Sequence, residues 1–274
     1  MVTRLRDVLD FVERKWPSSG AESWDSVGLV SGALDAEIRR ILLAVDAAQL
    51  TVQEAVDTSA DLLLIHHPLL LRGVTTVAET TAKGSLLAQL IRADVALIAA
   101  HTNADVVQTG TSAALAAALD LEGSKPIVPA ASDPERGLGR IGVLREPTTL
   151  GALARKLAGI LPSTATGIRA AGSFERVVET IALCGGAGDS LLNDPAVLGA
   201  DVYITSDLRH HPASESLEQS IARGTGPALI DTSHWASEWL WLDYAARELQ
   251  EEFPQLQVEV SELRTDPWDF AIPQ

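Results

Sequence analysis

Short aliphatic runs alternate along the chain with segments whose apolar residues recur at helical spacing. The aliphatic runs predict buried strands over residues 41–46, 61–67, 95–101, 140–144, 178–184, 201–205 and 227–231. The helical spacing predicts helices over residues 4–16, 49–58, 84–92, 111–119, 150–160, 191–198 and 212–223. Strands that are apolar along their length and separated by helices indicate α/β sheets, mostly parallel or mixed, that are covered on both faces.

A stretch rich in Pro, Gly, Ser and charged residues, 122–137, is the best candidate for a linker. We therefore expect two similar α/β lobes, one formed by residues 1–125 joined by 231–274, the other by 126–230. A weak repeat relates them. Ile41 and Ile181 each open a predicted strand, and twenty positions later each is followed by an aspartate, Asp61 or Asp201, that opens the next strand; both copies then end in His-His-Pro. Chance and duplication explain this repeat about equally well, so it indicates only similar lobes.

The charge balance and the cysteine count narrow the partners and the compartment. The 274-residue chain has a formal net charge of -16 and no cluster of Lys and Arg, which argues against nucleic acid as a partner. Its single cysteine, Cys184, excludes an intramolecular disulfide and a thiolate zinc site. The N-terminus does not resemble a signal peptide, and no apolar run approaches the roughly 18–20 residues of a membrane helix. We expect a cytoplasmic protein without a membrane partner.

Histidines gather where the predicted strands end. All six lie at or just beyond such an end: His66, His67, His101, His210, His211 and His234. Ligands of open α/β sheets bind at the carboxyl ends of parallel strands, and imidazoles together with carboxylates are common ligands of divalent metals. A single histidine at such a position is more often a helix cap or a satisfied polar group. Six together favour a metal site.

The stretch His66-His67-Pro68 has two interpretations. Neighbouring residues of a regular strand point to opposite faces. Because Pro68 ends the strand, the two imidazoles can diverge toward two neighbouring metal ions, one histidine for each ion. Alternatively, Pro68 only ends the strand and His67 is solvated beyond it. The motif alone does not decide between them.

The segment D-T-S-H-W-A-S-E, residues 231–238, carries a sharper local signal. Tryptophan and aliphatic residues downstream follow one helical stripe, so His234 and Glu238, four positions apart, share a helix face and can hold one ion. Asp231, Thr232 or Ser233 would cap this helix. The alternative is a solvated His and Glu beside the tryptophan stripe.

Five motifs in order resemble one family. They are W-D-S-V-G-L-V-S-G (24–32), H-H-P (66–68), H-T-N-A-D (101–105), T-S-D-L-R-H-H (205–211) and D-T-S-H-W-A-S-E (231–238). Together they resemble the Nif-three-like dinuclear-metal-centre family, whose members are also called GTP cyclohydrolase I type 2 homologues. The chain departs from the family pattern at Ser26, where Asn is usual, and at Asp207, where Glu is usual. Both positions lie outside the ligand set that the resemblance implies.

The resemblance implies two α/β lobes with a metal site in the cleft between them, and a ring-shaped homohexamer. It implies two divalent metal ions (Zn, Fe or Mn) held by His66, His67, Asp105, His234 and Glu238. The cavity would be lined by His101, His210 and His211, for which we expect catalytic proton transfer.

A pair of divalent ions suits hydrolysis. We therefore expect a metal-dependent hydrolase of the GTP cyclohydrolase kind, acting on a nucleotide or a related small molecule. In that scheme Asp105 and Glu238 bridge or chelate the ions, whereas His66 and His67 anchor separate ones. The alternative is a non-catalytic metal-binding scaffold or a metal-handling interaction protein.

Two nucleotide-related motifs are weak or missing. A Rossmann-like oxidoreductase ranks last, because A-V-D-A-A-Q follows the first predicted strand where G-x-G-x-x-G would be needed. The glycine-rich C-G-G-A-G-D, residues 184–189, is a loose candidate for a phosphate loop, although a tight turn from strand to helix explains it better.

Overall fold

Two sheets organise the chain, each within its own compact unit. The computed structural model describes residues 2–131 and 133–272. Unit 1 comprises Met1–Ala104 with Leu242–Thr265, and unit 2 comprises Asp105–Trp241 with Asp266–Gln274. The boundaries between the units therefore fall after residues 104 and 241, whereas the sequence pattern predicts boundaries after residues 125 and 230. Residues 1, 132, 273 and 274, which the predicted lobes and linker include, lie outside the described part.

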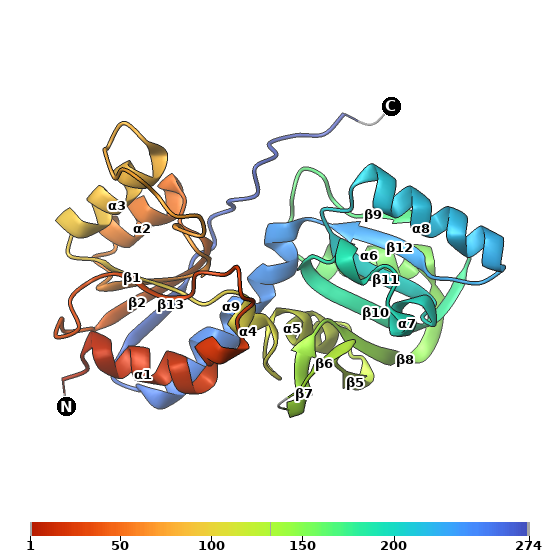
Figure 1. The fold of residues 1–274 in the computed structure, drawn as a ribbon, viewed down its shortest axis with the longest axis horizontal. Coiled ribbons are helices and arrows are strands. Elements are labelled where there is room, and N and C mark those ends of the chain that lie inside the picture. The colour runs from red at the N-terminus through yellow and green to blue at the C-terminus, as the bar shows by residue number, and fades with distance from the viewer. Residues whose placement is uncertain (1, 132, 273–274) are drawn as a thin grey trace. The chain divides into compact units, whose positions relative to one another are not determined.

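The sheet of unit 1 has the order β1-β4-β3-β2-β13, parallel throughout except at β1, which runs antiparallel to β4. In Figure 1, α2 and α3 lie together on one face of this sheet and α1 lies on the other. Its strands are β1 (Gly28–Ser31), β2 (Arg40–Asp46), β3 (Leu62–His67), β4 (Ala96–Ala99) and β13 (Gln257–Val260). Its helical elements are α1 (Leu5–Lys15), η1 (Ser18–Gly20), α2 (Gln49–Asp57), α3 (Ala82–Arg92) and most of α4 (Thr102–Asp105).

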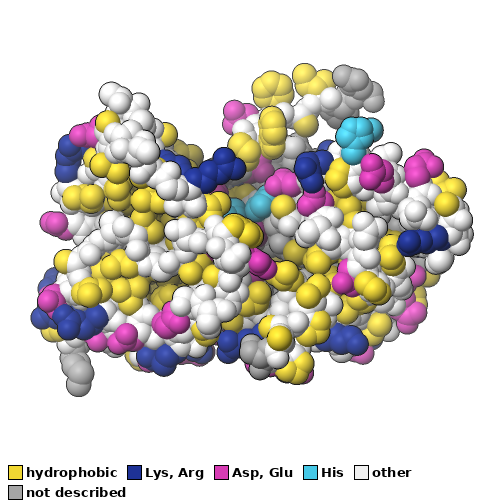
Figure 2. Space-filling view, viewed as in Figure 1, with side chains coloured by type: hydrophobic (Ala, Val, Ile, Leu, Met, Phe, Trp, Pro, Cys, Tyr) yellow, Lys and Arg dark blue, Asp and Glu magenta, His cyan; other side chains and the backbone are white. Residues whose placement is uncertain are grey.

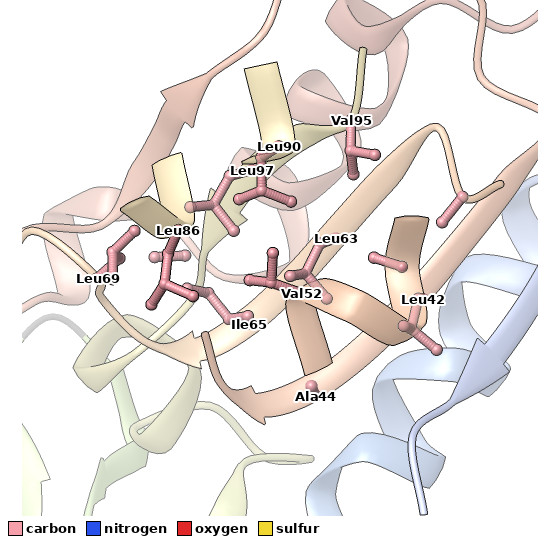
Figure 3. Close-up of a cluster of buried hydrophobic side chains, with 13 residues drawn as sticks. Leu42, Ala44, Val52, Leu63, Ile65, Leu69, Leu86, Leu90, Val95 and Leu97 are labelled. Carbon is pink, nitrogen blue, oxygen red and sulfur yellow. The ribbon is translucent and has the colours of Figure 1, made fainter. Parts of the chain in front are cut away.

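The core between the sheet and α2 and α3 explains why the strands are aliphatic along their length. Leu63 and Ile65 of β3 point toward Val52 of α2 and toward α3 (Figure 3). The alternate residues Leu62 and Leu64 are also fully buried, because the other face of the sheet is covered too. Each such side chain stabilises the fold by about 1.5–3 kcal/mol relative to an exposed position.

The sheet of unit 2 is mixed, with the order β5-β8-β10-β11-β12-β9. The central strands β10, β11 and β12 run parallel, and the remaining pairs are antiparallel. The strands of this sheet are β5 (Glu122–Lys125), β8 (Arg140–Thr149), β9 (Arg169–Ala171), β10 (Val177–Ala187), β11 (Val202–Ser206) and β12 (Ala228–Thr232). The helical elements are α5 (Thr111–Ala118), α6 (Leu150–Ile160), η2 (Asp189–Leu191), α7 (Pro195–Leu198), α8 (His210–Arg223) and the start of α9 (His234–Glu252).

The predicted linker over 122–137 is wrong. Residue 132 is not described. The rest of this stretch contributes β5 to the six-stranded sheet. It also forms a separate two-stranded sheet from β6 (Val128–Ala130) and β7 (Asp133–Leu138). Its Pro and Gly residues fit an edge strand and a two-stranded hairpin, where missing ladder bonds are tolerated. The predicted helix over 191–198 is also shorter, because Asp194 caps α7 and Pro195 begins it.

The weak sequence repeat corresponds to a shared hydrogen-bond arrangement. In unit 1, Asp61 Oδ2 accepts the backbone N–H groups of Arg39 and Arg40 just before β3 begins. In unit 2, Asp201 Oδ2 accepts those of Glu179 and Thr180 just before β11 begins. In each unit the strand that follows pairs in parallel with an earlier strand, and the paired residues are twenty-one positions apart: Ile41 with Leu62 and Ile181 with Val202.

Charged side chains are dispersed on the face that Figure 2 presents. Lys and Arg occur there in small separate groups among acidic side chains rather than as one continuous basic surface. Among the described residues, no helix is both long enough and apolar enough to cross a membrane.

Candidate metal centre

The carboxyl end of β3 places two adjacent histidines among oxygen acceptors in unit 1. His66 is fully buried, and its Nδ1 donates to the carbonyl oxygen of Ala100 at 2.8 Å. His67 pairs with Asp46 in the ladder between β3 and β2, and its Nδ1 donates to Asp46 Oδ1 at 2.7 Å. A carbonyl or a carboxylate oxygen can only accept, so both rings carry a proton on Nδ1.

His101 follows β4 and is held in the same way. Its Nδ1 donates to Asp25 Oδ1 at 2.8 Å, and Asp25 comes from the W-D-S-V-G motif before β1. The rings of His66, His67 and His101 have centroids 5.1–5.4 Å apart. One ligand nitrogen from each lies within 4.8 Å of the other two, a spacing that could hold a metal ion.

This grouping adds a third imidazole to the two adjacent histidines. The ring centroids of His66 and His67 are 5.1 Å apart, and His101 lies close to both. The three side chains thus form one imidazole set, in which the Nδ1 protons leave Nε2 to supply the lone pair that a metal needs. That His66 and His67 anchor separate ions and that His101 lines the cavity both stay predictions.

The first turn of α9 places His234 and Glu238 together in unit 2, as the spacing predicted. His234 Nε2 lies 3.0 Å from Glu238 Oε1, and the Glu238 side chain is 4 % exposed. Ser233 caps the helix, because its Oγ accepts the backbone N–H of Ala236 at 3.2 Å. His234 Nδ1 bonds to Asp207 Oδ2 at 2.7 Å, so this ring has the same carboxylate support as His67 and His101.

The surroundings of His234 favour positive charge. Burial alone would lower the pKa of His234, but the negative charge of Glu238 and the hydrogen bonds with Asp207 and Glu238 raise it from 6.5 to about 11. These interactions favour the protonated imidazole, whose Nε2 lies 3.0 Å from Glu238 Oε1.

A glycine of β10 lies directly against this pair. Gly186 has φ +68°, and a Cβ atom there would lie 2.3 Å from Glu238 Oε1 and 3.2 Å from His234 Nε2. Its N–H donates to Ser237 Oγ at 2.9 Å, on the same helix turn. This glycine belongs to the C-G-G-A-G-D stretch, most of which continues β10 and brings its backbone close to α9.

The remaining expected site residues lie in different surroundings. Asp105 ends α4 at the start of unit 2, and its Oδ1 accepts the hydroxyl of Thr111 at 2.5 Å. His210 and His211 are exposed in the first turn of α8, with ring centroids 5.2 Å apart. Within residues 2–131 and 133–272, no group of three side chains that could hold a metal ion includes Asp105, His210 or His211.

The sequence reasoning missed the carboxylates that support the imidazoles. Asp25, Asp46 and Asp207 each bind the Nδ1 side of one histidine. Asp46 ends β2 and Asp207 directly follows β11. Position at the end of a parallel strand, the signal that indicated the histidines, would therefore have indicated these two aspartates as well. Asp207, a departure from the family pattern, therefore contacts the proposed ligand His234, and its φ of +56° lies in a region that Asp tolerates better than most residues.

The fold and these side-chain sets define an α/β protein with a candidate centre for divalent metals. The chain belongs to the Duf34/NIF3 (NGG1p interacting factor 3) family, whose model matches residues 3–267. A relative from Streptomyces coelicolor, named GTP cyclohydrolase 1 type 2 homolog, is 50% identical over 272 residues, covering 97% of this chain and 93% of the relative.

Solved structures agree on the fold. A Bacillus cereus protein related to NIF3 superposes with a TM-score of 0.90 at 23% identity, covering 99% of this chain and 100% of its own. A Staphylococcus aureus hypothetical protein superposes with a TM-score of 0.86 at 27% identity, covering 99% of this chain and 100% of its own.

Proposed function

We propose that this chain binds two divalent metal ions and is a metal-dependent hydrolase of a nucleotide or a related small molecule. The chemistry of the donors supports metal binding. Each of His66, His67, His101 and His234 has its Nδ1 bonded to an oxygen. Such support fixes the tautomer and the ring orientation of metal-binding histidines, which makes this shared arrangement the observation that carries the proposal.

Two donor sets support the proposed number of ions. Unit 1 offers the imidazoles of His66, His67 and His101, and unit 2 offers His234 with Glu238. Asp105 is the further ligand that the family resemblance implies. That donors of both units serve one dinuclear centre in the cleft between the lobes stays a prediction, as does the homohexamer.

Nitrogen and carboxylate donors without thiolates suit zinc, iron or manganese. When bound, such an ion would polarise a substrate oxygen and make water more acidic. The chain's own groups would orient the substrate and carry protons. Glu238, whose side chain is 4 % exposed and whose Oε1 lies 3.0 Å from His234 Nε2, is the best placed to accept one. Proton transfer by His101, His210 and His211 stays a prediction, and for His101 it applies only while Nε2 holds no metal ion.

The name of the Streptomyces coelicolor relative supports GTP as the first substrate to test. Opening the imidazole ring of guanine by hydrolysis releases formate. We expect formate from GTP, or hydrolysis within a panel of nucleotides and phosphoesters, with protein loaded with Zn, Mn or Fe. Glu238→Ala should lose this rate, whereas the exposed Glu215→Ala should keep it.

If wild type and Glu238→Ala hydrolyse every substrate of this panel at the same background rate with every metal, the chain is not a hydrolase of these substrates. The chain would then be the non-catalytic metal-binding scaffold, provided that metal analysis of the same samples still finds divalent ions. Sedimentation of the loaded protein tests the hexamer separately.

A further inference from the structure

The W-D-S-V-G motif has no part in the ligand set, yet its aspartate is tied closely to His101. The side chain of Asp25 is fully buried. Its Oδ1 accepts from the backbone N–H of Ser26 at 2.7 Å and from His101 Nδ1 at 2.8 Å. Its Oδ2 accepts the N–H of Thr102 at 3.0 Å and also the Thr102 hydroxyl. One carboxylate therefore accepts four hydrogen bonds, which is close to its full capacity.

These bonds also fix which atom donates between Asp25 and His101. Two backbone N–H groups and a hydroxyl already donate to the two carboxylate oxygens. The ring of His101 therefore donates to Asp25 through Nδ1.

The backbone of His101 is held separately from its ring. The N–H of His101 donates to Asn103 Oδ1 at 2.9 Å, and Asn103 Nδ2 donates to the carbonyl of Trp16. Asn103 is buried. The carboxylate of Asp25 thus acts on the imidazole ring, whereas Asn103 acts on the backbone. Trp24 contacts the ring edge-on, with centroids 6.0 Å apart, and its indole is a donor and not an acceptor.

We propose that Asp25 is a positioning residue that holds His101 in the Nδ1–H tautomer and turns its Nε2 toward the imidazoles of His66 and His67. This inference deepens the proposed function and rests on it for the metal. It assigns the W-D-S-V-G motif to the metal centre, and it makes His101 the third imidazole of one ion's ligand set. The backbone N–H of Thr102, which donates to the other carboxylate oxygen, fixes the angle at which Asp25 meets the ring.

The tautomer can be measured without metal. Solid-state ¹⁵N NMR of sedimented full-length protein labelled with ¹⁵N-histidine separates protonated Nδ1 from protonated Nε2 and does not depend on particle size. His101→Asn assigns the signal. We expect His101 to be wholly Nδ1–H in wild type and to lose most of that population in Asp25→Ala. If Asp25→Ala does not fold, Asp25→Asn provides the same test. Its amide has a single acceptor oxygen, which cannot accept from His101 and Ser26 on one side and from Thr102 on the other.

Thr102→Val is the matched control. It removes one bond to Asp25 Oδ2 and the hydroxyl that accepts the Glu22 N–H at 2.9 Å, but it leaves the Oδ1 bond to His101. We expect its His101 to stay Nδ1–H. An unchanged tautomer in a folded Asp25 variant, or an equal loss in Thr102→Val, would overturn the positioning role.

Zn²⁺ titration by calorimetry gives the second measurement. Removing a carboxylate behind a ligating histidine typically lowers metal affinity about 10- to 100-fold. We expect a loss in that range for the Asp25 variant and none for Asp243→Asn, an exposed carboxylate of α9. A changed tautomer with wild-type Zn²⁺ affinity would overturn the role of Asp25 in metal binding. Absence of Zn²⁺ binding in wild type would instead contradict the proposed function, and the tautomer result would remain interpretable.

Discussion

At the scale of single residues, the site is built from histidines whose Nδ1 side is already occupied by an oxygen. Asp46, Asp25 and Asp207 support His67, His101 and His234, and a backbone carbonyl supports His66. This arrangement commits His66, His67 and His101 to one tautomer, and all four rings to one orientation, before any ion binds. The energetic cost of ordering the side chains is thus met by folding rather than by metal binding.

Gly186→Ala tests how closely the site is packed. The new Cβ would lie 2.3 Å from Glu238 Oε1, so Glu238 must move, and we expect weaker metal binding together with about 1–2 kcal/mol of lost stability from the positive φ. Gly224→Ala is the matched control, because Gly224 has φ +71° and no atom near its Cβ position. It should lose similar stability in urea unfolding but keep metal binding by calorimetry. Equal metal affinity in both variants would contradict the packing.

The raised pKa of His234 predicts how the stability of metal-free protein depends on pH. The pKa of His234 in the folded chain lies above its ordinary value, so protonated His234 stabilises the folded state. This stabilisation is complete below pH 6.5 and is lost as the pH rises toward about 11. We expect the urea midpoint of chelator-treated wild type to fall between about pH 6 and about pH 10, and to fall less in Glu238→Gln, which removes the negative charge. The same slope in both proteins would exclude the His234–Glu238 pair as its cause.

At the scale of elements, the site follows from strand ends. β3 and β4 end at or just before His66, His67 and His101, and α9 begins at His234 directly after β12. Because parallel strands bring their carboxyl ends to one edge of the sheet, residues distant in sequence meet there. The hydrophobic pattern predicted these strands and most of the helices, and it therefore predicted where the histidines would lie.

The sequence could not predict which donors group together. The tilt of His66 and His67 toward each other depends on the Asp46 and Ala100 acceptors, and these come from neighbouring strands. The strand pairing of 122–125 and the hairpin of β6 and β7 were also missed, because these short, largely exposed strands lack the apolar pattern of buried ones. Local patterns report burial, whereas these features depend on contacts between distant segments.

The repeated aspartates predict equal effects in the two units. Asp61→Ala and Asp201→Ala each leave two backbone N–H groups without their acceptor, so we expect each variant to lose about 1–3 kcal/mol in urea unfolding. Asp57→Ala, on the end of α2, serves as a control and should change stability by less than about 0.5 kcal/mol. A large loss for one repeated aspartate and none for the other would show that the two hydrogen-bond arrangements are not equivalent.

At the scale of the whole molecule, membership in the Duf34/NIF3 family and the donor sets of the two units lead to the same proposal. An excess of carboxylates, with net charge -16, attracts cations in general but does not select a site. In the proposed centre, the oriented imidazoles would provide that selection. The identity of the metal depends on cellular supply as well as on the ligands, so neither the sequence nor the fold determines it.

Metal content is the most direct test of this account. Wild type, a His66→Ala/His101→Ala variant and a His234→Ala/Glu238→Ala variant would be loaded with Zn, Mn or Fe, dialysed against metal-free buffer and analysed by mass spectrometry of the elements. We predict two ions per chain in wild type and the loss of at least one in each variant, with folding verified by circular dichroism. Wild type that retains no divalent ion under any loading condition, or variants that retain the full amount, would contradict the account.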